Sequence, residues 1–183
     1  MEVVPLEIPD VKVITPKRIG DHRGFFSEVF NRTALRAAGI DHEWVQDNHS
    51  LSKQAGVVRG LHFQMPPMAQ DKLIRVVRGA ILDVAVDVRR GSPTFGKHVV
   101  AELSAENWKQ MYVPVGFAHG FVTLAPETEV IYKVSRPYSP THDRGIRWDD
   151  PAVGIAWGID AASATLSDRD RKHPPLASMT DLF

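Results

Sequence analysis

The stretch AILDVAVDVRR, residues 80–90, narrows the choice of fold more than any other part of the chain. Its even-numbered positions from 82 to 88 are all aliphatic: Leu82, Val84, Val86 and Val88. The other face carries two carboxylates, Asp83 and Asp87. Because side chains alternate across a strand with a period of two, the pattern predicts a β-strand with one apolar face toward a core.

Other segments show the same periodicity. In TEVIYKVS (128–135), Val130, Tyr132 and Val134 share one face. The stretch QMYVPVGFAHGFVTL (110–124) predicts two short strands around Gly116 to Gly120. LIRVV (73–77) precedes Arg78-Gly79 and is expected to form a hairpin with the 80–90 strand.

Helix is expected to be scarce. NRTALRAAGI (31–40) has an Asn31 cap and a Gly39 stop, so it predicts one short helix. Residues 104–110 predict a single turn capped by Ser104, and a short helix is expected before Pro174-Pro175. Many short strands separated by turns, without repeats or linkers, indicate an all-β jelly-roll barrel with one or two short peripheral helices, formed by residues 1–183 as a single domain.

Composition excludes several classes of function. The 22 Lys and Arg residues balance 22 Asp and Glu residues, so no net field favours nucleic acid or an anionic membrane. The chain has no cysteine, which excludes disulfides, thiolate metal sites and a Cys nucleophile. No signal peptide and no run of about 18 apolar residues is present. We expect a soluble, cytoplasmic protein.

His62 and His119 are the first candidates for chemistry. His62 lies in GVVRGLHFQ between two apolar neighbours, where a structural histidine is the commoner outcome, and His119 in GFAHGF is equally ambiguous. A metal in such a barrel would want a second ligand two residues along the strand, and that position is Gln64, a poor transition-metal ligand. We therefore expect no catalytic metal.

Tyr132 and a group of charged residues remain open on local grounds. Tyr132 is either a core aromatic or a general acid that stays protonated at neutral pH, since its reference pKa is about 10. Four charged residues interrupt apolar stretches: Arg23, Glu28, Arg59 and Lys72. They are either surface positions or a pocket for an anionic ligand. Asp170 lies in the charge cluster LSDRDRKHP, where a solvated surface is the default.

The order of motifs along nearly the whole chain resembles the dTDP-4-dehydrorhamnose 3,5-epimerase family. The blocks that carry the resemblance are DHRGFFSEVF, WVQDNHSLS, GVVRGLHFQ, DKLIRVVRGAILDVAVDVRRGSPTFG, LSAENWKQMYVPVGFAHGF, YKVSRPYSP and GIRWDDPAVGIAW. The resemblance implies a cupin-type jelly roll that acts as a homodimer without metal or cofactor. The implied substrate is a dTDP-4-keto-6-deoxyhexose, which loses and regains protons at C3 and C5.

The resemblance also implies a role for individual residues. His62 is implied to be the base, oriented by Asp170, with Tyr132 as the opposing proton donor and Lys72 as the cation near the C4 oxygen. The implied substrate contacts are Arg23, Glu28, Gln46, Asp47, Asn48, Arg59, His119, Tyr138, Asp143 and Arg169. Arg23 and Arg59 are implied to hold the diphosphate, and Tyr138 to stack on the thymine.

Two positions depart from the family pattern, and one conflicts with strand alternation. Asp143 replaces the usual Glu and Arg169 replaces a common Lys. Strict alternation puts Arg59 and His62 on opposite faces, so we expect a bulge or bend at Gly60 to bring both to one ligand. The alternatives to a double epimerase are a relative acting at C3 or C5 only, a metal-dependent cupin and a non-catalytic sugar-nucleotide binding module.

Overall fold

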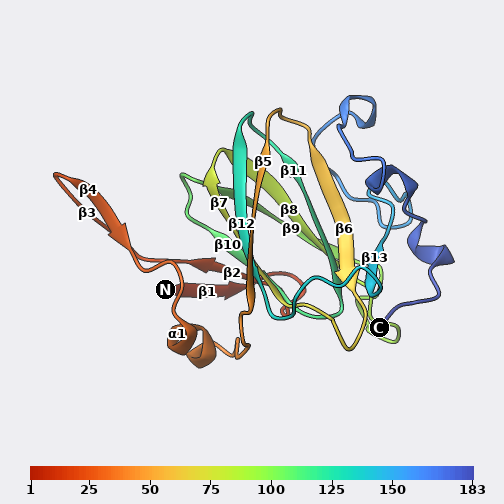
Figure 1. Ribbon diagram of the computed structural model, residues 1–183, viewed down its shortest axis with the longest axis horizontal. Coiled ribbons are helices and arrows are strands. Elements are labelled where there is room, and N and C mark those ends of the chain that lie inside the picture. Colours follow the sequence, from red (N-terminus) through yellow and green to blue (C-terminus); the bar gives the residue numbers. More distant parts are fainter.

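Two antiparallel sheets face each other in the computed structural model, which describes residues 1–183 (Figure 1). The first sheet has the strand order β1 (Glu2–Pro5), β2 (Lys12–Thr15), β10 (Gln110–Val113), β7 (Lys72–Arg78), β12 (Thr128–Val134) and β5 (Gln46–Ser52). The second has the order β13 (Asp143–Gly145), β6 (Val58–Gln64), β11 (Phe117–Thr123), β8 (Ala80–Asp87) and β9 (His98–Ser104). The predicted all-β jelly roll is confirmed.

A third sheet, of two strands, projects from the barrel. β3 (Arg18–Asp21) and β4 (Gly24–Ser27) form a hairpin that projects away from both sheets (Figure 1). Three of its apolar side chains are exposed: Ile19, Phe25 and Phe26, the last at 71%.

The strand at 80–87 is buried on both faces. Ile81 and Ala85 point into the apolar core between the sheets, as do Ile74 from β7 and Val130 from β12. The opposite, aliphatic face lies on the outside of the second sheet. There the C-terminal segment covers it, with Trp148 and Trp157 among the covering residues, so the barrel has a second core outside its wall. Figure 1 shows this segment in blue along one side of the barrel.

The hairpin predicted between residues 73–77 and the 80–90 strand is wrong. β7 pairs with β10 and β12 in the first sheet, whereas β8 pairs with β9 and β11 in the second. Only Gly79 separates the two strands, and a two-residue hairpin turn does not fit into one residue. Gly79 has a φ of 74° and carries the chain from one sheet to the other.

The helix predictions hold. α1 (Arg32–Ala37) begins at Asn31, whose side chain accepts a hydrogen bond from the Ala34 N–H. The turn after β9 is capped by Ser104, whose Oγ accepts from the Asn107 N–H at 2.9 Å. The C-terminal segment holds three 3₁₀ turns, η1 (Ala161–Ser163), η2 (Asp170–Lys172) and η3 (Leu176–Ser178). No helix is long and apolar enough to cross a bilayer.

A bulge lies at Gly60, as the sequence predicted. On β11, His119 pairs with His62 and Phe121 with Arg59, so three steps along β6 match two along β11. Gly60 has a φ of 133° and packs directly on β11. The extra residue reverses the alternation, so Arg59 and His62 line the same cavity.

Replacing Gly60 with Ala tests this close packing. A Cβ at Gly60 would lie 2.5 Å from the Cα of Gly120 and 3.0 Å from the His119 carbonyl oxygen. We expect Gly60→Ala to lower the free energy of unfolding by about 2 kcal/mol or more, measured in urea.

Gly24→Ala is the matched control, because Gly24 also has a φ of 133° but has no atom within 4 Å of the added Cβ. It reports the backbone strain alone, expected at about 1 kcal/mol. Equal losses in the two variants would show that contact with β11 is unimportant.

Candidate active site

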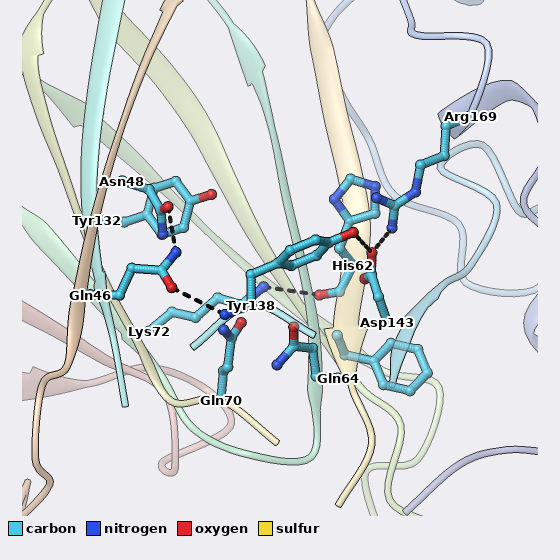
Figure 2. Close-up of a pocket in the computed structure, with 11 residues that line it drawn as sticks. Gln46, Asn48, His62, Gln64, Gln70, Lys72, Tyr132, Tyr138, Asp143 and Arg169 are labelled. Atoms are coloured by element: carbon cyan, nitrogen blue, oxygen red, sulfur yellow. Dashed lines mark hydrogen bonds and ion pairs between the residues drawn. The ribbon is translucent and has the colours of Figure 1, made fainter. Parts of the chain in front are cut away.

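Two adjoining cavities open between the sheets, with volumes of about 280 and 260 Å³. They share four lining residues, which come from both sheets and from the segment before η2: His62, Lys72, Tyr132 and Arg169. Eleven of the fourteen predicted site residues line one or both cavities: His62, Lys72, Tyr132, Asp170, Gln46, Asn48, Arg59, His119, Tyr138, Asp143 and Arg169. The fold therefore gathers most of the predicted site in one place (Figure 2).

His62 forms a short hydrogen bond with Asp170. Its Nε2 lies 2.6 Å from Asp170 Oδ1, although the two residues are 108 positions apart in the chain. Burial raises the pKa of Asp170, but the neighbouring His173 and His62 outweigh it and hold that pKa well below its usual range. Because the carboxylate is ionised, Nε2 carries the ring proton and Nδ1 of a neutral His62 is left as a base.

The pKa of His62 lies below its usual value. Burial is the main cause, and the cations Lys72 and Arg169 act in the same direction. The hydrogen bond and the negative charge of Asp170 oppose them. The ring is therefore held in its neutral, basic form at neutral pH.

Lys72 supplies a buried cation beside His62. Its Nζ donates to the His62 carbonyl oxygen at 3.2 Å, and the residue is only 7% exposed. Burial lowers the pKa of Lys72 to about 8, against the pull of Asp143 and Asp83. The ammonium form still predominates at neutral pH, in a place where an anion would be strongly stabilised.

Tyr132 lies across the cavity from His62, on β12 of the first sheet (Figure 2). Burial raises the pKa of its hydroxyl, which Arg59 opposes and Asp143 reinforces. The phenol therefore keeps its proton at neutral pH and can deliver it from the side opposite the imidazole.

Arg59 and His119 extend the site along the second cavity. Arg59 is held by Ser52 Oγ at 3.3 Å and by the Leu51 carbonyl at 3.2 Å. His119 Nε2 lies 2.7 Å from Asp83 Oδ1, and Asp83 is fully buried. Asp83 thus fixes the orientation of the His119 ring, as Asp170 does for His62.

A group of mutually bonded polar side chains lines the first cavity. The Tyr138 hydroxyl donates to Asp143 at 3.0 Å, and Arg169 forms an ion pair with the same carboxylate oxygen (Figure 2). Gln46 donates to Asn48 at 2.8 Å. Asp143 and Arg169, the two residues expected to depart from the family pattern, are therefore partners of each other.

Three predicted contacts lie outside the cavities. Arg23 is in the turn of the projecting hairpin, is exposed and pairs with Asp21. Glu28 follows the hairpin and accepts from Asn31. Asp47 points to the other side of β5 and pairs with Lys133 at 2.8 Å.

His173 is a further residue of the site that the sequence did not predict. Its Nε2 lies 3.6 Å from Asp170 Oδ1, so two imidazoles share one carboxylate oxygen. The three-residue spacing of Asp170 and His173, typical of one helical turn, was the available signal. Gln64 is occupied elsewhere: its amide bonds to Met68, Pro137 and Ser139.

This geometry defines a class of enzyme. The neutral imidazole of His62, hydrogen-bonded to the Asp170 carboxylate, faces the protonated phenol of Tyr132. The buried ammonium group of Lys72 lines the same cavity. Such a set can remove a proton from carbon beside a carbonyl, stabilise the enolate and return a proton on the other face. The fold and the site together describe a cupin-type epimerase or isomerase.

Comparison with known proteins gives the family. Residues 5–178 match the family model for dTDP-4-dehydrorhamnose 3,5-epimerase. The chain is 56% identical over 178 residues to the Sinorhizobium fredii protein of that name, covering 97% of this chain and 91% of the relative. The chain belongs to the dTDP-4-dehydrorhamnose 3,5-epimerase family.

Solved structures agree in fold. A Legionella pneumophila 3,5-epimerase in complex with dTDP-4-keto-L-rhamnose has a TM-score of 0.93 and 41% identity, over 97% of this chain and 94% of that one. ChmJ from Streptomyces bikiniensis, a 3′-monoepimerase in complex with dTDP-quinovose, has a TM-score of 0.89 and 38% identity, over 95% and 87%.

The titration of His62 tests the electrostatics of the site. We expect NMR to place its pKa below 6.5, the unperturbed value. Asp170→Asn removes a charge that favours the imidazolium, so it should lower the pKa further. Lys72→Met removes a charge that disfavours it, so it should raise the pKa.

The His62→Asn spectrum assigns the signal by its disappearance. Shifts of the same sign in the Asp170 and Lys72 variants would contradict the proposed balance of charges.

Proposed function

We propose that this protein inverts C3 and C5 of dTDP-4-dehydro-6-deoxy-D-glucose to give dTDP-4-dehydro-L-rhamnose. The observation that carries the proposal is the His62–Asp170 pair facing Tyr132 across the cavity. The family relationship supports this choice of substrate and product.

His62 is the base in this proposal. The C4 ketone acidifies the protons at C3 and C5, and His62 Nδ1 takes each in turn. Asp170 Oδ1 accepts a hydrogen bond from Nε2–H, with 2.6 Å between Nε2 and Oδ1, so it holds the ring in place and stabilises the imidazolium that forms. Proton abstraction leaves a pair of electrons that moves onto the C4 oxygen as an enolate.

Lys72 and Tyr132 complete each inversion. The buried Lys72 ammonium stabilises the enolate oxygen, and exclusion of water strengthens that attraction. Tyr132 then protonates the same carbon from the opposite face, which changes its configuration. Before the next round the imidazolium of His62 releases the abstracted proton to solvent, and the phenolate of Tyr132 takes up a proton.

A single-site epimerase is the second candidate. The structural similarity to ChmJ, a 3′-monoepimerase, is the observation that favours it. The same base and acid serve one carbon or two, so the outcome depends on whether the ring can present both carbons to His62.

Isotope exchange decides between the two. With dTDP-4-dehydro-6-deoxy-D-glucose in D₂O, we expect deuterium at both C3 and C5, measured by NMR and mass spectrometry of the sugar. Label at only one of the two carbons would refute double epimerisation.

His62→Ala is the control for that assay. It should reduce exchange at both carbons by about 10²- to 10⁴-fold while the dTDP-sugar still binds. A wild-type protein that binds the sugar without exchange would be a binding module, and wild-type exchange lost after EDTA treatment would indicate a metal-dependent enzyme.

We further propose that the protein acts as a homodimer whose β3–β4 hairpin reaches the partner's site. The hairpin projects from its own barrel and exposes Phe25 and Phe26, which association would cover. Its turn carries Arg23, a predicted diphosphate contact that lies outside its own cavities. Insertion of the hairpin into the partner's cavity would bury Phe25 and Phe26 and bring Arg23 to the partner's diphosphate. The diphosphate would then be bound by Arg23 from one chain and by Arg59 from the chain that holds the cavity.

Mixing two inactive variants tests the shared site. Arg23→Ala and His62→Ala each lack one part of every site in their own homodimers. After subunit exchange, each mixed dimer holds one site with both residues intact. We expect the equimolar mixture to recover about a quarter of wild-type activity if all dimers form at random.

Light scattering should give the mass of a dimer for the wild type, Arg23→Ala and His62→Ala. A mixture that exchanges subunits, shown by mass spectrometry of tagged chains, but recovers no activity would place Arg23 in its own chain's site.

A further inference from the structure

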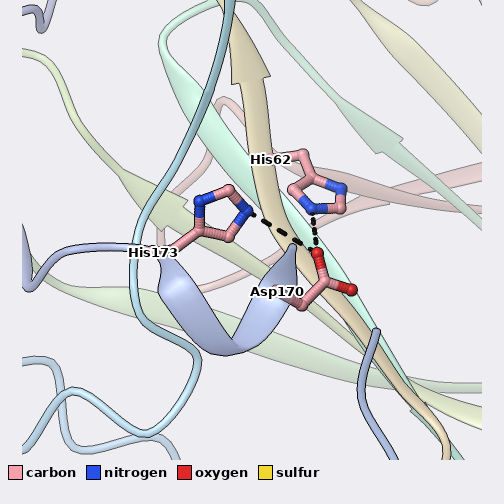
Figure 3. A group of neighbouring side chains, drawn as sticks. All are labelled: His62, Asp170 and His173. Carbon is pink, nitrogen blue, oxygen red and sulfur yellow. Dashed lines mark hydrogen bonds and ion pairs between the residues drawn. The ribbon is translucent and has the colours of Figure 1, made fainter. Parts of the chain in front are cut away.

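Three metal-ligating groups converge behind the proposed base. One ligand atom each from His62, Asp170 and His173 lies within 4.8 Å of the others (Figure 3). Both imidazoles present Nε2 to the same oxygen, Asp170 Oδ1, at 2.6 Å from His62 and 3.6 Å from His173. Epimerisation as described above needs only the first of these contacts.

His173 is held in this position without a hydrogen bond. Its Nε2 is buried and has no hydrogen-bond partner, although a buried polar atom normally has one. Its ring packs against Gly145, where any larger residue would collide with it. Gly145 is paired with His62 across β13 and β6, so the two rings are fixed relative to the same strands. The ring centroids are 5.3 Å apart.

We propose that this triad, His62–Asp170–His173, is a binding site for a divalent transition metal such as Zn²⁺, and that the metal inhibits the enzyme. Two imidazole nitrogens and one carboxylate oxygen are the protein ligands of many open zinc sites, in which a fourth position is left for solvent. His62 and Asp170 also line the second cavity, which supplies that fourth position. Small movements of the side chains would place each of the three ligand atoms at roughly 2.0–2.2 Å from a bound zinc ion, the usual Zn–N and Zn–O bond lengths.

The surroundings select the kind of ion. Lys72 and Arg169 act on His62 with positive charge and oppose any cation. Arg169 is paired with Asp143, and Asp170 itself is ionised, which offsets this repulsion. Mg²⁺ and Ca²⁺ need mostly oxygen ligands, so a site with two nitrogens favours Zn²⁺ or Co²⁺ over them.

Inhibition follows from which ring nitrogen binds the metal. A neutral imidazole that ligates a metal through Nε2 keeps its proton on Nδ1. Nδ1 is the nitrogen that takes the substrate proton, so the metal-bound His62 is not a base. This consequence rests on the proposed role of His62, whereas metal binding itself does not.

Cobalt binding gives a test that is independent of activity. Titrating the full-length protein with Co²⁺ should produce, at one equivalent, the visible absorption of a four-coordinate site, and Zn²⁺ should displace it. His173→Asn should weaken Co²⁺ binding by at least about 10-fold. His62→Asn, which removes a second ligand, should do the same.

His49→Asn is the matched control. His49 Nε2 also lies 2.9 Å from a carboxylate, that of Glu129, but this pair is exposed and has no third ligand nearby. The variant should bind Co²⁺ as the wild type does. Circular dichroism shows whether each variant is folded.

The activity measurement compares each protein with and without Zn²⁺. Wild type and His49→Asn should lose activity in Zn²⁺ and regain it with EDTA, and His173→Asn should need at least about 10-fold more Zn²⁺ for the same fractional loss. No four-coordinate Co²⁺ spectrum, or one that survives His173→Asn, would overturn the proposal. Failure of the epimerase assay would leave the cobalt result unaffected.

Discussion

The hydrogen bond between His62 and Asp170 joins the jelly-roll barrel to the C-terminal segment that packs on its outside. His62 is on β6 inside the jelly roll, whereas Asp170 is on η2, in a segment wrapped around the outside of the second sheet. Burial of Trp148, Trp157 and Leu176 against that sheet holds the segment in place. The carboxylate reaches the imidazole only because this outer core forms. Stability of the C-terminal wrap and basicity of the site are therefore coupled.

The bulge at Gly60 has a comparable role inside the barrel. Strand alternation separates side chains onto two faces, but the proposed function needs the cation Arg59 and the base His62 on one face. The extra residue on β6 brings Arg59 to the cavity of His62. Gly120 on the neighbouring strand leaves room for this, because a side chain there would meet the Arg59 carbonyl and Leu61. Two glycines thus allow one strand to carry both functions.

Local sequence rules predicted the positions of strands and of the helix better than they predicted which strands pair. Alternation identified the strands at 80–87 and 128–134, and capping identified α1, because these signals act within a few residues. The predicted partner of the 80–87 strand was wrong because Arg78-Gly79 suits both a hairpin turn and a crossover between sheets. A hairpin is excluded because only one residue separates the two strands, and that spacing is known only once the end of each strand is known.

The site shows the same division. Spacing along β6 drew attention to Gln64, and the resemblance drew it to Asp170. Neither revealed that His173 shares the Asp170 oxygen, because that contact depends on how η2 docks on the barrel. The charge cluster around Asp170 suggested a solvated surface, yet Asp170 is only 5% exposed. Its charged neighbours in the cluster are exposed, so burial of this one carboxylate is a tertiary effect that composition does not encode.

The same features that make a good base also make a metal ligand. Both uses need a neutral imidazole, an ionised carboxylate and limited access of water. On β6, Gln64 occupies the position where a second strand ligand was considered, and its amide is bonded to loop backbone. Directly after η2, however, His173 contributes a nitrogen that proton transfer does not require. The two uses exclude each other through the ring tautomer, because His62 cannot bind a metal at Nε2 and keep Nδ1 free for a proton.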